Sequence, residues 1–394
     1  MARNISIPIT IIIILLSAVF MLINPQETVQ AASQGLHLWY SVVLPALFPF
    51  FIVAELLVKI RFVNFLGILL EPIMQPLFRL PGCSSLVVVM GFTSGFPVGA
   101  ILTRKLYEQK MLTSNEAERL FAFTNNASPL FILGAVGVGM FANPAVGYLL
   151  AIAHYLSNLL VGFLWRFRGE PCKSAAKPGL ARLKEAYQAM LPVAEEPPEG
   201  LGKLLGDAIR SSLNNIMAVG GFIIIFSVLT RMLTIWGFID SMTAILLKLL
   251  GGLALSYNQV YGLCMGIFEM TIGAKTAISS STNTALPLLM VVSSILAFSG
   301  LSIIAQIMSI MAGTSVRWSF YLISRFLQVI FSCIITFISY RIALSWGMAS
   351  IQVNAIPFYK VLYDFNAWTF SINCLAVAWL MILVLMLIAL CRSR

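Results

Sequence analysis

Two charged side chains interrupt a strongly apolar stretch, Tyr257–Ser281. Glu269 and Lys275 are the only charged residues in it, and Gly266 and Gly273 flank the glutamate. An isolated charge is unfavourable in hydrocarbon, so a carboxylate at membrane depth is expected to have a function. Glu269 could bind Na+ or carry a proton, and Lys275 could neutralise an anionic substrate. A Glu269–Lys275 ion pair that holds the stretch closed is the alternative interpretation.

A second group is polar but uncharged, and it lies in the middle of the apolar stretch Glu116–Met140. The string Thr124-Asn125-Asn126-Ala127-Ser128-Pro129 places two amides and two hydroxyls there. Such groups need a partner or a ligand inside a bilayer, and the proline frees nearby carbonyls because it disrupts helical hydrogen bonding. Polar contacts that only join neighbouring helices are the alternative. One such contact is expected from His154 and Asn158, which share one face of the next span.

Breaks in the apolar segments must position these residues. Gly91-Phe-Thr-Ser-Gly-Phe-Pro97 interrupts Ser84–Tyr107, and each half is shorter than the roughly 20 residues that cross a bilayer. A break at membrane depth is tolerated where its backbone faces protein or a water-filled cavity. The segment therefore predicts a re-entrant hairpin, with a single kinked helix as the alternative. Tyr257–Ser281 predicts a second hairpin, and Phe298–Ser302 a second broken span.

The two halves of the chain follow the same order of spans and breaks. If neither hairpin crosses the membrane, the basic segments 59–61, 104–110 and 166–184 all lie on the cytoplasmic side, as the positive-inside rule requires. Corresponding helices then run in opposite directions, which is typical of secondary transporters. The predicted fold is an all-α polytopic membrane protein, an inverted-topology repeat with two re-entrant helical hairpins and about eight full transmembrane helices.

This reading divides the chain into five parts and proposes one site. The parts are residues 1–35 (N-terminal transmembrane helix and outer loop), 36–166 (first repeat), 167–208 (cytoplasmic polar loop), 209–341 (second, inverted repeat) and 342–394 (outer loop and C-terminal transmembrane helix). The two hairpin tips and the two broken spans should converge, because transporters of this kind bind substrate near the midplane between half-helix ends. The candidate substrate-binding residues are Thr93, Ser94, Gly95, Asn125, Asn126, Ser128, Thr271, Lys275 and Ser299, and Glu269 is the candidate for a coupling Na+ or proton.

Composition excludes several other classes of protein. With 59% hydrophobic and 10% charged residues among 394, the chain has no stretch long enough for a separate soluble domain. Six scattered cysteines without a CxxC pair and two distant histidines predict no metal site. The net charge of +10 is explained by loops that orient the protein in lipid, not by nucleic acid. No nucleophile–base pair or phosphate loop is present, so neither an enzyme nor a cofactor is expected.

Three strings carry a family resemblance over about residues 35–345. They are Leu44-Pro-Ala-Leu-Phe-Pro-Phe-Phe51, Gly91-Phe-Thr-Ser-Gly-Phe-Pro-Val-Gly-Ala100 and Thr124-Asn-Asn-Ala-Ser-Pro129. The chain resembles the YlbJ-type sporulation integral membrane proteins, also called the stage V sporulation protein VV family, within the nucleoside-recognition ("Gate") group. The resemblance implies a multipass protein of the outer forespore membrane that moves dipicolinate from the mother cell toward the forespore. The group is similar to concentrative nucleoside transporters, which are trimers, and this favours a homo-oligomer.

Physical chemistry is compatible with that substrate. Dipicolinate is a flat pyridine with two carboxylates, which suit Lys275, Asn125, Asn126 and the partial positive charge of half-helix N-termini. The leading expectation is therefore a transporter of a small anionic aromatic solute in the bacterial cell membrane. A nucleoside or nucleobase transporter is one alternative, and a non-transporting assembly protein of the sporulation membrane is the other.

Overall fold

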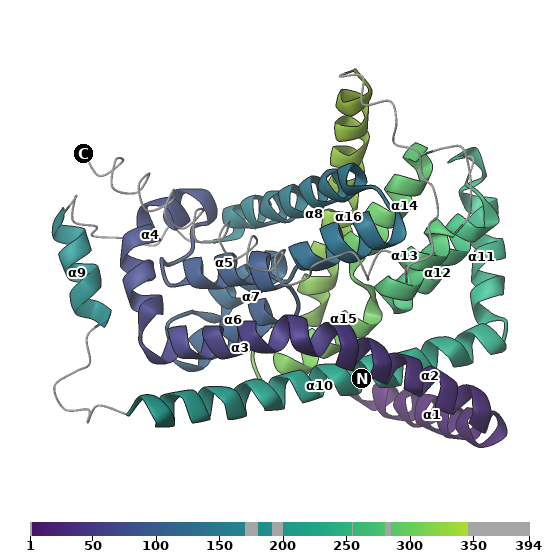
Figure 1. The fold of residues 1–394 in the computed structure, drawn as a ribbon, viewed down its shortest axis with the longest axis horizontal. Helices are drawn as coiled ribbons and strands as arrows, with labels where there is room; N and C mark the ends of the chain where they lie inside the picture. The colour runs from purple at the N-terminus through teal and green to yellow at the C-terminus, as the bar shows by residue number, and fades with distance from the viewer. Residues whose placement is uncertain (1, 170–179, 191–199, 254, 280–284, 346–394) are drawn as a thin grey trace.

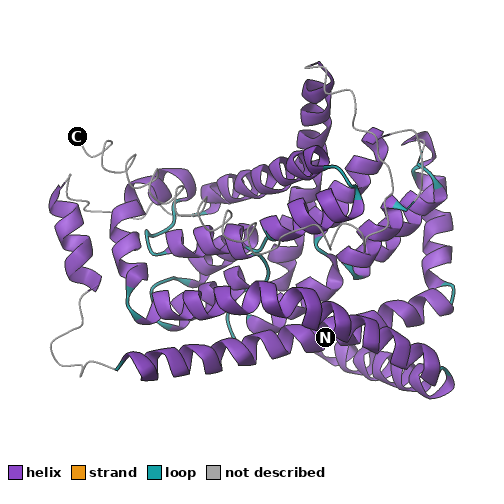
Figure 2. Cartoon of the chain, viewed as in Figure 1, coloured by secondary structure: helices purple, strands orange, loops and turns teal. Residues whose placement is uncertain are grey.

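The computed structural model describes residues 2–169, 180–190, 200–253, 255–279 and 285–345, and in this part every regular element is a helix (Figures 1 and 2). The first-half helices are α1 (Ala2–Ile23), α2 (Pro25–Leu38), η1 (Trp39–Val43), α3 (Leu44–Lys59), α4 (Phe62–Phe78), α5 (Ser84–Ser94), α6 (Val98–Glu108), α7 (Ser114–Thr124), η2 (Leu130–Met140), α8 (Pro144–Trp165) and η3 (Arg166–Arg168). The others are α9 (Leu180–Met190), α10 (Leu201–Ile235), α11 (Phe238–Leu249), η4 (Gly251–Leu253), α12 (Tyr257–Phe268), α13 (Met270–Ile278), α14 (Ala285–Phe298), α15 (Gly300–Ile310) and α16 (Trp318–Ser345).

Several of these helices are long and apolar enough to cross a membrane. Four such segments lie in the described residues: Pro144–Arg168, Leu201–Ile235, Ala285–Ile310 and Trp318–Ser345. A fifth span is possible from α1 and α2, which are bent by 107° at their junction. Other predicted spans are divided into shorter helices, and the predicted C-terminal span lies outside the described residues. The all-helical, polytopic character of the prediction is confirmed.

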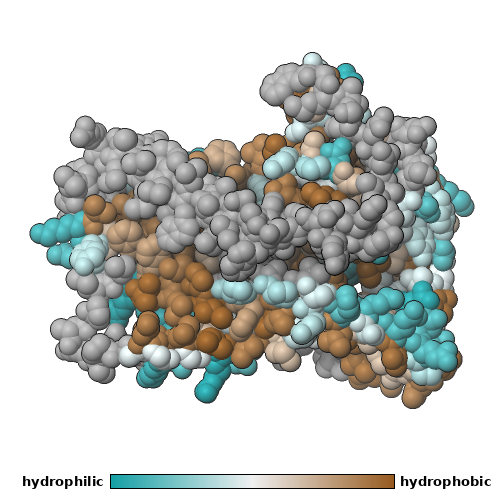
Figure 3. All heavy atoms as spheres, viewed as in Figure 1, coloured by the Kyte–Doolittle hydropathy of each residue, from teal (hydrophilic) through white to brown (hydrophobic). Residues whose placement is uncertain are grey.

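Brown, hydrophobic atoms cover the region of α3 in the space-filling view, while teal atoms gather at the left edge and lower right (Figure 3). Exposed side chains on α16, among them Phe326, Ile330 and Phe337, are likewise large and apolar. Apolar side chains on the outside of long helices are what contact with lipid tails requires. The chain is an integral membrane protein.

The continuous arm α2–η1–α3 lies antiparallel to α10 along the lower part of Figure 1. Arg231 pairs with Glu27 near one end (2.7 Å), and Lys59 pairs with Asp207 near the other (2.9 Å). Between them, Trp39 donates its indole N–H to the carbonyl of Ile216 (3.0 Å). The helices that open the two predicted repeats therefore run in opposite directions, as an inverted repeat requires.

The first hairpin, α5–α6, begins and ends at the same end of the molecule. The Cys83 thiol, just before α5, contacts the carbonyl of Met111, just after α6 (3.7 Å). Arg119 donates to the carbonyls of Phe78 and Arg79 (3.0 Å each), which ties the following helix to the same region. Both ends of the hairpin therefore lie at one end of the molecule, as the predicted re-entrant hairpin requires.

The second hairpin, α12–α13, enters from the opposite end. Its first residue, Tyr257, donates to Asp240 on α11 (2.7 Å), and α11 follows the end of α10 that pairs with Glu27. The two arms then return alongside each other, since a Cβ placed on Gly262 would lie 2.5 Å from the backbone nitrogen of Ala277. The hairpins thus dip toward each other from opposite ends.

Ion pairs join the helices at the end from which the first hairpin enters, called here the basic end. Lys105 pairs with Glu55 (2.6 Å), and Arg317 pairs with Glu118 (2.7 Å) through a carboxylate that is almost fully buried. Hydrogen bonds and the negative charge of Glu118 raise the pKa of Arg317 above its ordinary value. Arg317 belongs to the second predicted repeat and Glu118 to the first, so this end is locked across the two halves.

Two predicted loops are partly helical. Residues 25–35, expected in an outer loop, form most of α2, which packs along α10 and buries Ala31 and Gly35. The segment 167–208, expected to be a polar loop, contains α9, which packs on α4. It also contains the start of α10 at Leu201, so the predicted boundary at residue 208 falls inside a helix.

Candidate functional site

The tip of the first hairpin packs closely against the end of α7. A Cβ on Gly91 of α5 would lie 2.1 Å from the carbonyl oxygen of Thr124, and one on Gly99 of α6 would lie 2.4 Å from the same oxygen. At the tip, Gly95 has φ +82° and would place a Cβ 2.7 Å from the nitrogen of Ser128. Three glycines therefore let both hairpin arms and the tip pack directly on the broken backbone, an approach that any larger residue prevents.

The break between α7 and η2 is held open by side chains of α8. The backbone N–H of Ala127 donates to His154 Nε2 (3.1 Å), and the Ala127 carbonyl accepts from the Tyr155 hydroxyl (2.9 Å). Asn158 donates to the side-chain oxygen of Asn126. These bonds satisfy backbone groups that a continuous helix would have paired internally. The prediction that His154 and Asn158 bond a neighbouring helix is confirmed.

The predicted residues of the first half lie together around this break. Asn125 and Asn126 are fully buried, and their amide groups donate to the carbonyls of Phe121 (2.9 Å) and Phe123 (3.3 Å). The Ser128 hydroxyl accepts from the N–H of Phe131 (3.2 Å) at the start of η2. Asn125 Oδ1 has no hydrogen-bond partner among the described residues, so it alone of these amide oxygens is left to another group.

Thr93 and Ser94 differ in how their hydroxyls are used. Thr93 is half-buried and donates to the carbonyl of Val89 within its own helix (2.9 Å). Ser94 is buried, and its hydroxyl has no partner in the described part of the chain. Of these two residues, Ser94 is therefore the one whose hydroxyl lacks a protein contact.

The second hairpin and the second break repeat this packing. Gly300 has φ +80°, and a Cβ there would lie 3.1 Å from the carbonyl of Phe268 and 3.2 Å from the nitrogen of Met270. Those two residues flank Glu269, the residue that separates α12 from α13. Ser299 is fully buried in a left-handed conformation, φ 73°, and its hydroxyl has no partner among the described residues.

Glu269 caps its own hairpin arm. Its carboxylate accepts the backbone N–H of Ile272 (2.7 Å) at the start of α13. A carboxylate at a helix N-terminus satisfies a free donor and meets the positive end of the helix dipole. This terminus is therefore already occupied by the chain's own negative charge. Thr271 follows in the first turn and is half-buried, whereas Lys275 is exposed.

Arg325 on α16 is a buried residue that the sequence reading missed. It is 0% exposed and donates to the carbonyls of Asn125 (3.1 Å) and Ala122 (2.6 Å) and to the side-chain oxygen of Asn158 (3.1 Å). The next residue, Phe326, meets Phe298 at the second break, with ring centroids 5.6 Å apart. Helix α16 therefore passes both breaks at the level of Arg325. An arginine inside an apolar span was the signal that could have found it.

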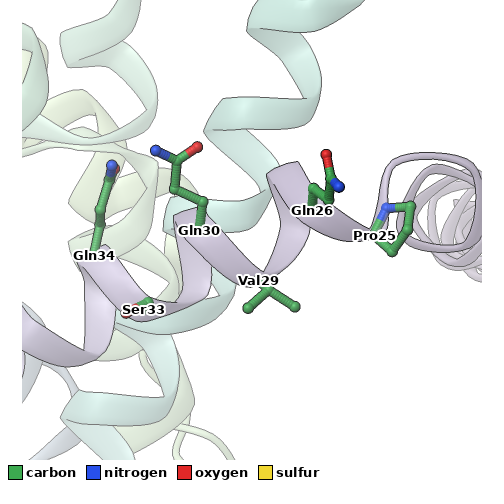
Figure 4. A pocket seen from close by; sticks show the side chains of 6 residues that line it. All are labelled: Pro25, Gln26, Val29, Gln30, Ser33 and Gln34. Atoms are coloured by element: carbon green, nitrogen blue, oxygen red, sulfur yellow. The ribbon is translucent and has the colours of Figure 1, made fainter.

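A hollow at the surface lies elsewhere, along α2 (Figure 4). Its lining is mostly glutamine and small residues, and Gln26, Gln30 and Gln34 point to the same side of the helix in the close-up. None of the predicted site residues lines it. Within the described residues, no group of three or more His, Cys, Asp or Glu side chains is placed to hold a metal ion.

Known proteins similar to this chain were found by sequence. Residues 40–144 match the family described as nucleoside recognition (Gate). The chain is 40% identical over 324 residues to the sporulation integral membrane protein YlbJ of Bacillus subtilis, an alignment that covers 81% of this chain and 79% of that protein. It is 29% identical over 166 residues to an uncharacterized protein of Alkalihalophilus pseudofirmus, covering 40% of this chain and 33% of that protein. No solved structure matches the chain.

Proposed function

The chain belongs to the family of the sporulation integral membrane protein YlbJ, and we propose that it is a membrane transporter for dipicolinic acid. In this proposal it moves the solute out of the mother cell across the outer forespore membrane during sporulation. The proposal gives the chain no catalytic role, and neither the matched family nor the named relative is described as an enzyme.

One observation carries the transport part of the proposal. Two broken helices are each packed against a re-entrant hairpin, and the hairpins enter from opposite ends of the molecule. Unwound backbone at membrane depth, arranged as an inverted repeat, is the architecture in which transporters bind substrate near the midplane. Alternating access then arises when one repeat moves against the other.

The choice of an anionic solute is supported by charge. Arg325 is buried at the level of both breaks, and none of the carboxylates in the described residues forms an ion pair with it. A buried cation favours a solute that brings its own negative charge. Dipicolinate supplies that charge through two carboxylates on a flat ring.

A nucleoside or nucleobase carrier is the second candidate, favoured by the Gate family match over residues 40–144. The coupling ion also belongs to the proposal: Glu269 is the candidate to bind Na+ or exchange a proton. We expect uptake of labelled dipicolinate, and not of uridine, by proteoliposomes that contain the purified protein. Uptake of uridine alone would replace the first candidate with the second.

A spore assay separates transport from an assembly role. A strain whose protein carries both Asn126→Ala and Thr93→Ala should make spores with little dipicolinate, provided the variant protein reaches the membrane in normal amounts. Normal dipicolinate in such spores would remove these residues from the proposed site.

A further inference from the structure

Helix α16 carries a stripe of buried polar side chains. Tyr321, Arg325, Gln328, Ser332 and Thr336 are all 0% exposed. They recur at intervals of three and four, which places them on one face of the helix. The stripe runs from Tyr321 to Thr336, a rise of about 22 Å along the helix, which is most of the roughly 30 Å thickness of a bilayer core.

The two ends of this stripe differ in how their polar atoms are satisfied. Ser332 and Thr336 both bond Ser293 on α14, at 2.6 and 2.8 Å. At the other end, the Tyr321 hydroxyl, Arg325 Nε and both polar atoms of the Gln328 amide have no partner in the described part of the chain. Unpaired polar atoms in a protein interior are strongly unfavourable, and a native structure keeps a cluster of them for a reason.

Arg325 is only partly neutralised by the groups that it contacts. Two of its partners are the carbonyls of Ala122 and Asn125, at the C-terminal end of α7, where the helix dipole supplies roughly half a negative charge. The third partner is the neutral amide of Asn158. The ring of Tyr321 lies 4.9 Å from the guanidinium carbon and adds a weak attraction. Net positive charge therefore remains at a fully buried position.

The other expected anion sites are less suitable. Glu269 already occupies the N-terminus of α13 with a carboxylate, and Lys275 is exposed. Arg325, in contrast, lies seven residues into α16 from Trp318, or about 10 Å along the helix. Both breaks lie beside α16 at that position.

We propose that Arg325 and Gln328 form the site that binds a carboxylate of the transported solute. One carboxylate binds the unpaired Nε–H and, in exchange for the carbonyl of Ala122, an Nη2–H, which is the bidentate manner that arginine favours. The Gln328 amide, almost one turn further along the stripe, bonds the solute's ring or second polar group. This site rests on the proposed function, since it presupposes that the chain binds a small solute.

The decisive variant is Gln328→Met, because the Gln328 amide makes no bond to the described residues. Replacing an unpaired buried amide by an apolar side chain of similar volume should raise the melting temperature without ligand. If the amide serves the solute, the same change should weaken dipicolinate binding at least tenfold. Gln306→Met on α15 is the matched control, since Gln306 also has a buried, unpartnered Nε2. It should stabilise the protein and leave binding unchanged.

The role of Arg325 is tested by comparing how its variants bind charged and neutral ligands. Binding is measured as ligand-dependent shifts in melting temperature for dipicolinate, orotate, uridine and neutral pyridine-2,6-dicarboxamide. Arg325→Lys keeps the charge but loses the fork, and Arg325→Gln loses both. Affinity for the two carboxylates should fall at least tenfold in each variant, about 1.4 kcal/mol, with little change for the diamide.

The outcomes separate the site from the function. If wild-type protein binds dipicolinate and both Gln328→Met and Arg325→Lys bind it equally well, the site is wrong and the function stands. If wild-type protein binds orotate but not dipicolinate, and the Arg325 variants lose that binding, the site stands and the proposed substrate falls. If wild-type protein binds neither carboxylate, both are overturned. Should Arg325→Gln fail to fold, Arg325→Lys and Gln328→Met decide alone.

Discussion

Replacing Gly91 by alanine tests the contact between the first hairpin and the first break. The new Cβ would lie 2.1 Å from the carbonyl oxygen of Thr124. Real Cβ contacts are not shorter than 3.0 Å, so the hairpin or α7 must move by at least 3.0 − 2.1 = 0.9 Å. The obstructing atom is backbone and cannot rotate away. Overpacking of this kind costs about 1–3 kcal/mol, and we expect a value near the upper end.

Gly221→Ala is the matched control, because Gly221 lies in helix α10 and an added Cβ meets nothing within 4 Å. Both substitutions gain the helix propensity of alanine, about 1 kcal/mol, so the difference between them isolates the steric term. Melting temperatures change by about 2–4 °C per kcal/mol in chains of 150–250 residues and by less in longer ones. In detergent, we therefore expect the Gly91→Ala protein to melt at least about 2 °C below the Gly221→Ala protein. Equal melting temperatures would mean that the hairpin does not pack against the Thr124 carbonyl of α7 as described.

Two further experiments test the inverted topology. The first uses a maleimide that cannot cross the membrane, applied to single-cysteine variants in a cysteine-free background. It should label Gln109→Cys from one side and Asn258→Cys from the other, because the two hairpins enter from opposite ends. Labelling of both variants from the same side would contradict that arrangement. The second uses a short bismaleimide as a crosslinker. It should join Lys59→Cys to Asp207→Cys, whose native side chains pair at 2.9 Å, and should not join Glu27→Cys to Asp207→Cys. The reverse result would show that α3 and α10 run parallel.

The breaks in the membrane segments were predictable because glycine and proline act locally. Gly95 and Pro97 predicted the first hairpin, and the structure separates α5 from α6 at these residues. The second half has no proline at its breaks, yet Glu269 and Ser299 each interrupt a helix. There the signal was polarity, since a carboxylate or a hydroxyl beside glycine is poorly placed inside a continuous apolar helix.

Helices outside the spans were predicted less well. The string from Pro25 to Leu38 contains three glutamines and a glycine, and it becomes helical through packing along α10. Tertiary contacts of that kind cannot be read from local propensity. Helix α9, in contrast, is composed largely of alanine, leucine and charged residues of high helix propensity. Its composition was a usable signal within the predicted loop.

In the candidate site, too, residues that are close in sequence were predicted, and a residue that joins them only through the fold was not. Asn125, Asn126 and Ser128 were predicted as a cluster because they are neighbours in sequence, and they lie around one break. Arg325 could not be assigned to that cluster, since its partners Ala122 and Asn125 precede it by about 200 residues. What the sequence did contain was a cation in an apolar span, a feature that is a functional hypothesis by default.

Helix α16 is one element through which the two halves can influence each other. It belongs to the second predicted repeat and packs on α14 of that repeat, but it also packs on α7 and α8 of the first. Any movement of one repeat against the other changes the distance between Arg325 and the carbonyls of Ala122 and Asn125. The same guanidinium donors can bond either those carbonyls or a solute carboxylate. In the proposed mechanism, solute binding at Arg325 weakens a contact that holds the repeats together, which is the coupling that alternating access requires.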